Sequence, residues 1–219
     1  YKKFAAEGGD RGAIITTRLG HKYADRLIGT YMHLMVPLDV FVGGLPPASD
    51  YGPDETGWYE RNTNFFTAES GYCALQTTKP QTIAHALNDS PAGLCSWILE
   101  KRRTWSDCDG NVEKRFTKDE LITTMMIYWI TESYGTSARY YYECVHKPGQ
   151  ASHNRTPVVE SPTGIGLFQK EVILLPRKWA ERYYNLKHWT VMPSGGHFAP
   201  MEEPQRLVED IRKFFRTLR

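Results

Sequence analysis

Short segments with strand character lie in the first and last thirds of the chain, and the pattern between them is helical. Residues 1–6 are apolar enough to be the end of a strand, and residues 14–23 can form a helix. The apolar residues on one side of that helix are Ile15, Leu19 and Tyr23. Residues 26–35 carry the β-branched and aromatic side chains that strands favour. These segments predict a parallel β-α-β unit with a right-handed crossover.

The middle of the chain has helix start signals and no clear strand. Glycine and proline recur between residues 36 and 54, which predicts a connection. A helix can follow over residues 55–69, ended at Gly71, and Ser90 followed by proline predicts the start of another. Thr117 and Glu120 form a capping box that opens a third helix. A fourth is expected over residues 137–145.

Strand patterns return near the C-terminus, over residues 157–168 and 188–192, with a short helix predicted over residues 177–184 between them. The last helix is expected over residues 203–218. Its apolar stripe consists of Leu207, Val208, Ile211, Phe214, Phe215 and Leu218. The chain therefore reads as β-α-β, about a hundred helical residues, then β-α-β-α.

This order of elements predicts an α/β fold with a mainly parallel sheet and an inserted all-helical cap. The core would consist of residues 1–36 and 147–219, and the cap of residues 37–146.

Composition excludes several classes of function. The net charge of the 219 residues is +2, too small to indicate nucleic-acid binding, and no apolar run approaches the roughly 20 residues that span a bilayer. The four cysteines lack the paired spacing of a zinc site or a disulfide framework. We therefore expect no nucleic-acid partner, no membrane segment in this chain and no zinc site. The chain begins with Tyr1 directly in a predicted strand, which indicates part of a longer protein.

Residues 7–13 form a glycine-rich turn between the first predicted strand and helix. This layout is typical of a nucleophile elbow, in which one reactive side chain sits on a sharp strand-to-helix turn. Gly8 and Gly12 flank Asp10 at two residues on either side, where we expect a side chain to collide with the turn. The alternative is that Asp10 merely caps the helix.

Two further groups follow predicted strands. Glu171 comes after the third strand, and His197 comes after the fourth, behind two glycines. Parallel strands bring such groups to one edge of the sheet, where ligands bind. Nucleophile, acid and histidine in this order is the chain order of α/β-hydrolase triads. A histidine after a strand can also be purely structural.

Several segments resemble the epoxide hydrolases of the microsomal type, in matching order and with similar spacing over nearly the whole chain. They are GGDRGAIITTRLG, ESGYCALQTTKP, ALNDSPAGLCSWILEK, SARYYYE, SPTGIGLFQKE and SGGHFAPMEEPQRLVEDIRKFF. The resemblance implies an α/β-hydrolase fold with a helical cap. It also implies hydrolysis of an epoxide to a vicinal diol through a covalent alkyl-enzyme ester, with a small hydrophobic epoxide and water as partners. This chemistry requires no metal or organic cofactor.

The resemblance also implies the role of each site residue. Asp10 would be the nucleophile, His197 the general base and Glu171 the acid that orients it. Tyr72 and Tyr141 would hold the epoxide oxygen. Tyr141 is the middle one of three consecutive tyrosines, and only its offset from an arginine two residues earlier favours it.

Two residues are expected beside the substrate. The backbone N–H of Arg11 would help to stabilise the oxyanion, and Trp129 would contact the substrate. Family members usually have tryptophan where Arg11 stands, so a cation replaces an aromatic wall and should lower the pKa of Asp10. His33 stands near a position where asparagine is common.

The upstream half of such enzymes is missing from the chain. We therefore expect these 219 residues alone to be poorly soluble and weakly active or inactive, which diol formation from styrene oxide would test. The localisation depends on the N-terminal region, and homodimer formation is left open.

Two rival functions remain at this stage. A haloalkane or haloacid dehalogenase would share Asp10 and His197 and need halide donors, for which Trp97, Trp105, Trp129 and Arg11 are candidates. The other rival is a non-catalytic relative that binds a ligand in the cap cavity.

Overall fold

Four parallel strands form the sheet of the computed structural model, which describes residues 1–40 and 43–218. Residues 41, 42 and 219, within the predicted connection and at the end of the predicted core, lie outside the described residues. The strands are β1 (Phe4–Gly8), β2 (Leu27–Met32), β3 (Val159–Lys170) and β4 (Tyr184–Gly196). They lie in the order β1-β2-β3-β4, with β1 at one edge. The predicted parallel α/β sheet is confirmed.

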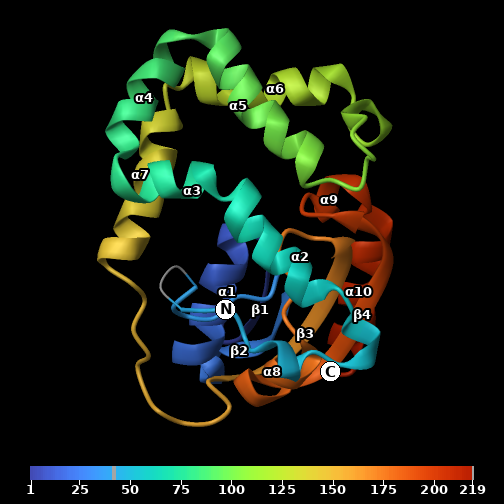
Figure 1. Cartoon of the computed structure of the whole chain (residues 1–219). Helices are drawn as coiled ribbons and strands as arrows, with labels where there is room; N and C mark the ends of the chain where they lie inside the picture. Colours follow the sequence, from blue (N-terminus) through green and yellow to red (C-terminus); the bar gives the residue numbers. More distant parts are fainter. Residues whose placement is uncertain (41–42, 219) are drawn as a thin grey trace.

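The helices fall into a core set and a cap set (Figure 1). The core set is α1 (Arg11–Lys22), α8 (Arg177–Tyr183), α9 (Ala199–Glu202) and α10 (Pro204–Arg216). The cap set is α2 (Trp58–Asn64), α3 (Gly71–Thr78), α4 (Pro80–Asp89), α5 (Pro91–Thr104), α6 (Lys118–Ile130) and α7 (Tyr134–His146). Short turns are η1 (Ala24–Arg26), η2 (Ala48–Asp50), η3 (Pro53–Glu55), the π-helical η4 (Phe65–Glu69) and η5 (Val112–Lys114). None of the helices in the described part of the chain has the length and apolar character to cross a membrane.

The two faces of the sheet are buried by different helices. Side chains alternate between faces along a strand, so neighbours such as Tyr31 and Met32 point in opposite directions. Met32 belongs to an apolar cluster with residues of α1 and α8, whereas Tyr31 belongs to a second cluster with residues of α9 and α10. The sheet is therefore covered on both sides, as the parallel arrangement requires.

Helix α1 forms where expected but buries a different face from the predicted one. Ile15 and Tyr23 are 55% and 45% exposed, although both were expected on a common apolar side. The buried side includes the small residues Ala13 and Gly20. A Cβ atom on Gly20 would lie 2.5 Å from the Ser161 hydroxyl of β3, so small residues let α1 approach the sheet closely. The close packing of α1 against β3 decides which side of the helix is buried, although the other side carries the predicted apolar residues.

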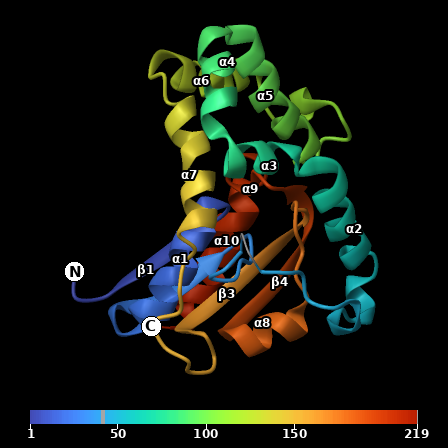
Figure 2. The same ribbon diagram turned by 60° about the vertical axis from the view of Figure 1, so that its left-hand side comes forward.

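The cap helices lie over one end of the sheet (Figure 2), and α7 contacts the first residue of α1, Arg11, through Tyr141. The described part of residues 37–146 contains helices and turns and no strand. The expected helix over residues 55–69 is confirmed from Trp58, with a π-helical last turn. Gly71 does not end the helical region as expected, because the chain breaks at Ser70 and Gly71 opens α3.

Candidate active site

Asp10 occupies the tight turn between β1 and α1. Its backbone has φ 46° and ψ −118°, a strained conformation for a residue with a side chain. Its side chain accepts no hydrogen bond from the first turn of α1, so Asp10 does not cap the helix through its carboxylate. The carboxylate is 55% exposed because it borders a cavity. The turn thus presents one acidic group, as a nucleophile elbow does.

The two glycines beside Asp10 have different roles. A Cβ atom on Gly8 would lie 2.3 Å from the carbonyl carbon of Gly12 and 2.4 Å from its oxygen, so the predicted collision is confirmed there. A Cβ atom on Gly12 would meet nothing within 4 Å, so the same prediction was wrong for Gly12. The absent side chain of Gly8 makes room for the backbone of Gly12.

This difference gives a matched pair of variants. We expect Gly8→Ala to lower the free energy of unfolding by about 1–3 kcal/mol, because the added methyl overlaps fixed backbone. Gly12→Ala lies in a helix and should be neutral or stabilising by up to about 1 kcal/mol. Urea unfolding followed by circular dichroism measures both changes. Equal effects of the two substitutions would contradict the steric argument.

His197 lies between two carboxylates. Its Nδ1 donates a hydrogen bond of 2.6 Å to Glu171 Oε1, and its Nε2 lies 3.6 Å from Asp10 Oδ2. Glu171 follows β3 and is fully buried, and His197 follows β4. Oε1 of Glu171 also accepts the N–H of Val172 at 2.7 Å, which fixes the carboxylate. The structure therefore brings the three predicted triad residues together in the expected order.

The two carboxylates control the charge of His197. Burial alone lowers its pKa, but the negative charge and hydrogen bonds of Glu171 and Asp10 outweigh burial and raise the pKa of His197 to about 10. Burial likewise raises the pKa of Asp10, but the hydrogen bond and charge of His197 outweigh it, and the charges of Arg11 and His33 add to the effect. The pKa of Asp10 is lowered overall, so the carboxylate is ionised at neutral pH.

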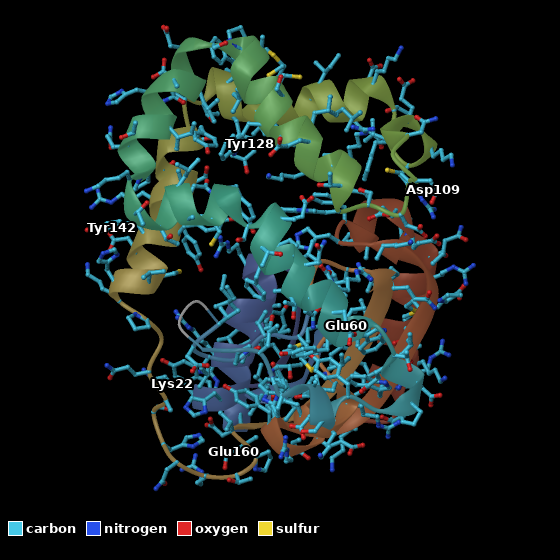
Figure 3. The ribbon with its side chains drawn as sticks, viewed as in Figure 1. Lys22, Glu60, Asp109, Tyr128, Tyr142 and Glu160 are labelled. Carbon is cyan, nitrogen blue, oxygen red and sulfur yellow. The ribbon has the colours of Figure 1, made fainter. Side chains whose placement is uncertain are left out.

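Tyr72 of α3 and Tyr141 of α7 meet on the cap side of the same cavity. Their ring centroids are 5.8 Å apart in an edge-to-face arrangement. Burial raises the pKa of both phenols, and the charge of Asp10 also acts on each. Both therefore remain protonated at neutral pH and can donate hydrogen bonds. Tyr142, the next residue of α7, lies on the outer side of the cap (Figure 3) and stacks on His146.

Arg11 connects the nucleophile with this tyrosine pair. Its Nε lies 3.8 Å from Asp10 Oδ1, and its guanidinium carbon lies 3.6 Å from the centre of the Tyr141 ring. Arg11 is also the first residue of α1, where helix N–H groups favour negative charge. Arg11, the cation expected beside the substrate, lines the cavity.

Trp129 is not brought to this cavity. It packs in the apolar core of the cap, against a cluster that includes Leu87 and Tyr134. Successive residues of an α-helix point about 100° apart, so Tyr128 lines the cavity in place of Trp129. Tyr128 projects to the inner side of the cap (Figure 3). Of these two residues, Tyr128 lines the cavity and Trp129 does not, so the substrate contact expected of Trp129 stays a prediction.

Cap residues that the sequence analysis did not assign hold the acid and base loops. Arg61 of α2 donates hydrogen bonds to the carbonyl oxygens of Gln169 and, at 2.5 Å, of Glu171. The carbonyl of Trp105 accepts the N–H of His197 at 2.9 Å, and its ring lies edge-to-face on the histidine, with centroids 5.3 Å apart. These contacts join residues distant in sequence, so no local pattern reveals them.

A second set of bonds extends the contact around Trp105. Asp107 accepts the N–H of Gly195 at 2.9 Å, and its own N–H donates to Glu202 at 2.7 Å. Arg115 bridges Asp107 and Glu203, with distances of 3.1 Å to each carboxylate. We call this group of contacts, between residues 105–115 of the cap and 195–203 of the core, the seam.

The site opens into two cavities that share Asp10, Arg11, Tyr72, Trp105, Tyr141 and His197. One has a volume of about 570 Å³ and reaches into the cap, where polar and charged side chains line it. The other has a volume of about 410 Å³ and is lined mostly by apolar residues of the core and α3. A substrate held at Asp10 can therefore extend in two chemically different directions.

No known family model matches the chain, but individual proteins are similar to it over nearly its whole length. The chain is 36% identical to epoxide hydrolase 1 of Sus scrofa over 235 residues, covering all of this chain and 52% of that protein. It is 36% identical to juvenile hormone epoxide hydrolase 2 of Ctenocephalides felis, covering 96% of this chain and 49% of that protein.

The fold is also similar to that of a solved epoxide hydrolase structure. The crystal structure of juvenile hormone epoxide hydrolase from Bombyx mori matches all of this chain and 56% of that one, with a TM-score of 0.84 and 31% identity. The chain spans about half the length of the curated relatives it matches. The sequence motifs, the parallel sheet with its helical cap and these likenesses agree: the chain belongs to the epoxide hydrolases of the microsomal type, within the α/β-hydrolase superfamily.

Proposed function

We propose that the protein of which this chain is part hydrolyses epoxides to vicinal diols through an ester on Asp10. One observation carries the proposal: an ionised carboxylate and two protonated phenols line the same cavity, with a buried His197–Glu171 pair behind the carboxylate. A carboxylate alone fits many reactions. Two phenol donors near it fit a reaction in which an alkoxide develops.

In the first half of the reaction, a carboxylate oxygen of Asp10 attacks an epoxide carbon from the side opposite the C–O bond. That bond breaks, and its electron pair goes to the epoxide oxygen. Tyr72 and Tyr141 donate hydrogen bonds to this oxygen, and one of them supplies the proton that makes it a hydroxyl. An alkyl ester of Asp10 results, which divides one difficult hydrolysis into two easier steps.

In the second half, His197 removes a proton from a water molecule, and the hydroxide attacks the carbonyl carbon of the ester. The backbone N–H of Arg11 is a donor to the tetrahedral oxyanion. When the C–O bond to the substrate breaks, the diol leaves and Asp10 is a carboxylate again. Ester formation removes the negative charge of Asp10, so the pKa of His197 falls below its value of about 10 in the free enzyme. The imidazolium of the free enzyme then gives its proton to the tyrosinate, so His197 becomes a competent base when the ester is present. At ester cleavage the departing alkoxide takes the carboxyl proton of Asp10, and His197 keeps the proton taken from water.

Turnover in heavy-oxygen water tests the proposal. After one cycle with styrene oxide, hydrolysis of the ester carbonyl leaves label in the carboxylate of Asp10, and mass spectrometry of its peptide detects it. Direct attack of water on the epoxide would put the label only in the diol and would overturn the covalent route. Diol formation without added metal, in the presence of a chelator, completes the measurement.

The tyrosine pair provides a separate prediction. We expect Tyr72→Phe or Tyr141→Phe to slow ester formation by about 100-fold, because one donor to the developing alkoxide is lost. Stopped-flow tryptophan fluorescence measures this step. Tyr142→Phe is the matched control, since it removes a phenol from the same helix outside the cavity. Equal rates for Tyr141→Phe and Tyr142→Phe would contradict the assignment of the middle tyrosine.

The dehalogenase alternative needs an indole or guanidinium donor directed at a halide. Trp105 lines both cavities, but its indole nitrogen is itself fully buried. The Arg11 guanidinium lines both cavities too, but it lies on the Tyr141 ring and beside Asp10, and Trp97 lines only the cap cavity. This placement favours the epoxide reaction. Chloride release from a haloalkane, without diol formation from an epoxide, would favour the dehalogenase instead.

A further inference from the structure

The cap lobe of the active site carries more positive charge than hydrolysis of a neutral epoxide requires. Asp10 is the one acidic residue among the described residues that line the 570 Å³ cavity, and it is already engaged with His197. Three cationic side chains line the same cavity: Arg11, Lys101 and Arg102. The guanidinium of Arg11 pairs with Asp10 and lies on the ring of Tyr141. The two cations of α5 are not used by the reaction.

Arg102 is the less compensated of the two. No carboxylate within the described ranges lies within ion-pair distance of its guanidinium, although Glu202 and Glu120 act on it from farther away. Its near neighbours are apolar: the guanidinium carbon lies 4.0 Å from the centre of the Phe198 ring and 5.2 Å from that of Phe116. The guanidinium also contacts the sulfur of Met201, at 3.4 Å. Burial lowers the pKa of Arg102, which reflects this desolvated position.

Lys101 places a second cation on the same lobe. Its side chain is 15% exposed, and its Nζ lies 4.8 Å from the centre of the Tyr72 ring and 5.5 Å from that of Trp105. It also contacts the neighbouring Glu100, whose carboxylate is 55% exposed and does not line the cavity. The positive end of Lys101 therefore lies among the aromatic side chains that surround the reacting atoms.

The position of Arg102 relates it directly to the site. Phe198, on which it lies, follows His197 in sequence, and the two rings are 5.1 Å apart. A charged group held at Arg102 is thus separated from the base by one aromatic ring. The opposite lobe is lined by apolar residues such as Val40, Phe65 and Val172, so the two ends of the substrate site differ in charge.

We propose that the cap lobe is an anion-binding subsite, with Arg102 as its main ligand and Lys101 beside it. The preferred substrate is then an epoxide with a carboxylate on the side of the cap and an apolar group on the side of the core. This inference rests on the proposed function, because it names the class of epoxide that the same site takes. An anion at Arg102 gains charge-assisted hydrogen bonds from the guanidinium.

Paired substrates test the subsite. The probe is 4-(oxiran-2-yl)benzoate, and its methyl ester is the neutral control of nearly the same shape and epoxide reactivity. We expect kcat/KM for the acid to exceed that for the ester by about 10- to 100-fold. Arg102→Gln should reduce the ratio to about threefold or less by slowing the acid alone, and Arg102→Lys should retain part of it.

Arg103→Gln is the matched variant. Arg103 follows Arg102 in α5, but its side chain is exposed and donates to the carbonyl of Gly110 at 2.8 Å. It should keep the wild-type ratio. High salt should lower the preference of the wild-type protein for the acid and leave the ester rate unchanged. Equal use of acid and ester by the wild type, or an unchanged ratio in Arg102→Gln, would overturn the subsite.

A binding measurement separates this inference from the proposed function. Calorimetry compares the diol of the benzoate with the diol of its methyl ester, for the wild type and for Arg102→Gln. Tighter binding of the acid diol that disappears in Arg102→Gln, without turnover of any epoxide, would refute hydrolysis and support the subsite. Turnover of both epoxides with equal affinity for both diols would support hydrolysis and refute the subsite.

Discussion

Asp10→Asn is expected to lower diol formation by about 10⁴-fold or more, because the amide has nearly the shape of the carboxylate and none of its nucleophilicity. The carboxylate is also one of the two charges that raise the pKa of His197. The variant should therefore lower the pKa of His197 below about 10, which NMR titration of the imidazole measures. Loss of turnover and a lowered histidine pKa together identify Asp10 as both nucleophile and charge partner.

Asp25→Asn is the control for this experiment, since Asp25 lies exposed in η1, away from the cavity. It should match the wild type in rate and in the histidine titration. Asp10→Ala checks that the loss does not depend on the amide. A rate for Asp10→Asn within about tenfold of the wild type would contradict the nucleophilic role.

His197→Gln is expected to stop the reaction halfway. Attack by Asp10 on the epoxide needs no base, whereas hydrolysis of the ester needs a deprotonated water. The variant should therefore form the alkyl ester and then hydrolyse it about 10³-fold or more slowly than the wild type. Intact-protein mass spectrometry should show a mass increased by one epoxide, and peptide mapping should place the addition on Asp10.

His85→Gln serves as its control, because His85 lies exposed on α4 and contacts Gln81. It should turn over normally without accumulating an adduct. The absence of any adduct in His197→Gln, with no diol formed, would mean that His197 is needed before the ester forms. That result would exclude a role confined to the second half-reaction.

The triad was predictable from sequence because it depends on strand ends. Asp10, Glu171 and His197 each follow a strand, and parallel strands bring their carboxyl ends to one edge regardless of packing details. The two tyrosines lie on cap helices, and the family motifs located them. The helices that carry them differ from the predicted ones in their bounds, because Gly71 opens α3 and α7 begins at Tyr134.

The parts that sequence did not predict depend on contacts between distant residues. Trp129 and Tyr128 are equally plausible on a helix until the neighbours of α6 are known. Both pack against the cap core, and only Tyr128 also lines the cavity. Ile15 looked like a core residue, but the close approach of α1 to β3 at Gly20 exposes it. The support that Trp105 gives to His197 passes through a backbone carbonyl, which leaves no trace in residue type.

Arg11 contacts both the nucleophile Asp10 and one of the two cavity tyrosines. It pairs with the nucleophile and lies on the ring of Tyr141, so it belongs to both the carboxylate side and the phenol side of the reaction. Its charge helps to keep Asp10 ionised, which lowers the basicity of that carboxylate. In the proposed reaction, a less basic Asp10 makes the hydrogen bonds from the two phenols more important for ring opening.

The seam between cap and core limits how the active site can open. Trp105, Asp107 and Arg115 bind the segment that carries His197, so the cap cannot lift away on this side without displacing the base. The seam thus ties the position of the imidazole to the position of the cap, and any change in the cap near residues 105–115 is transmitted directly to His197.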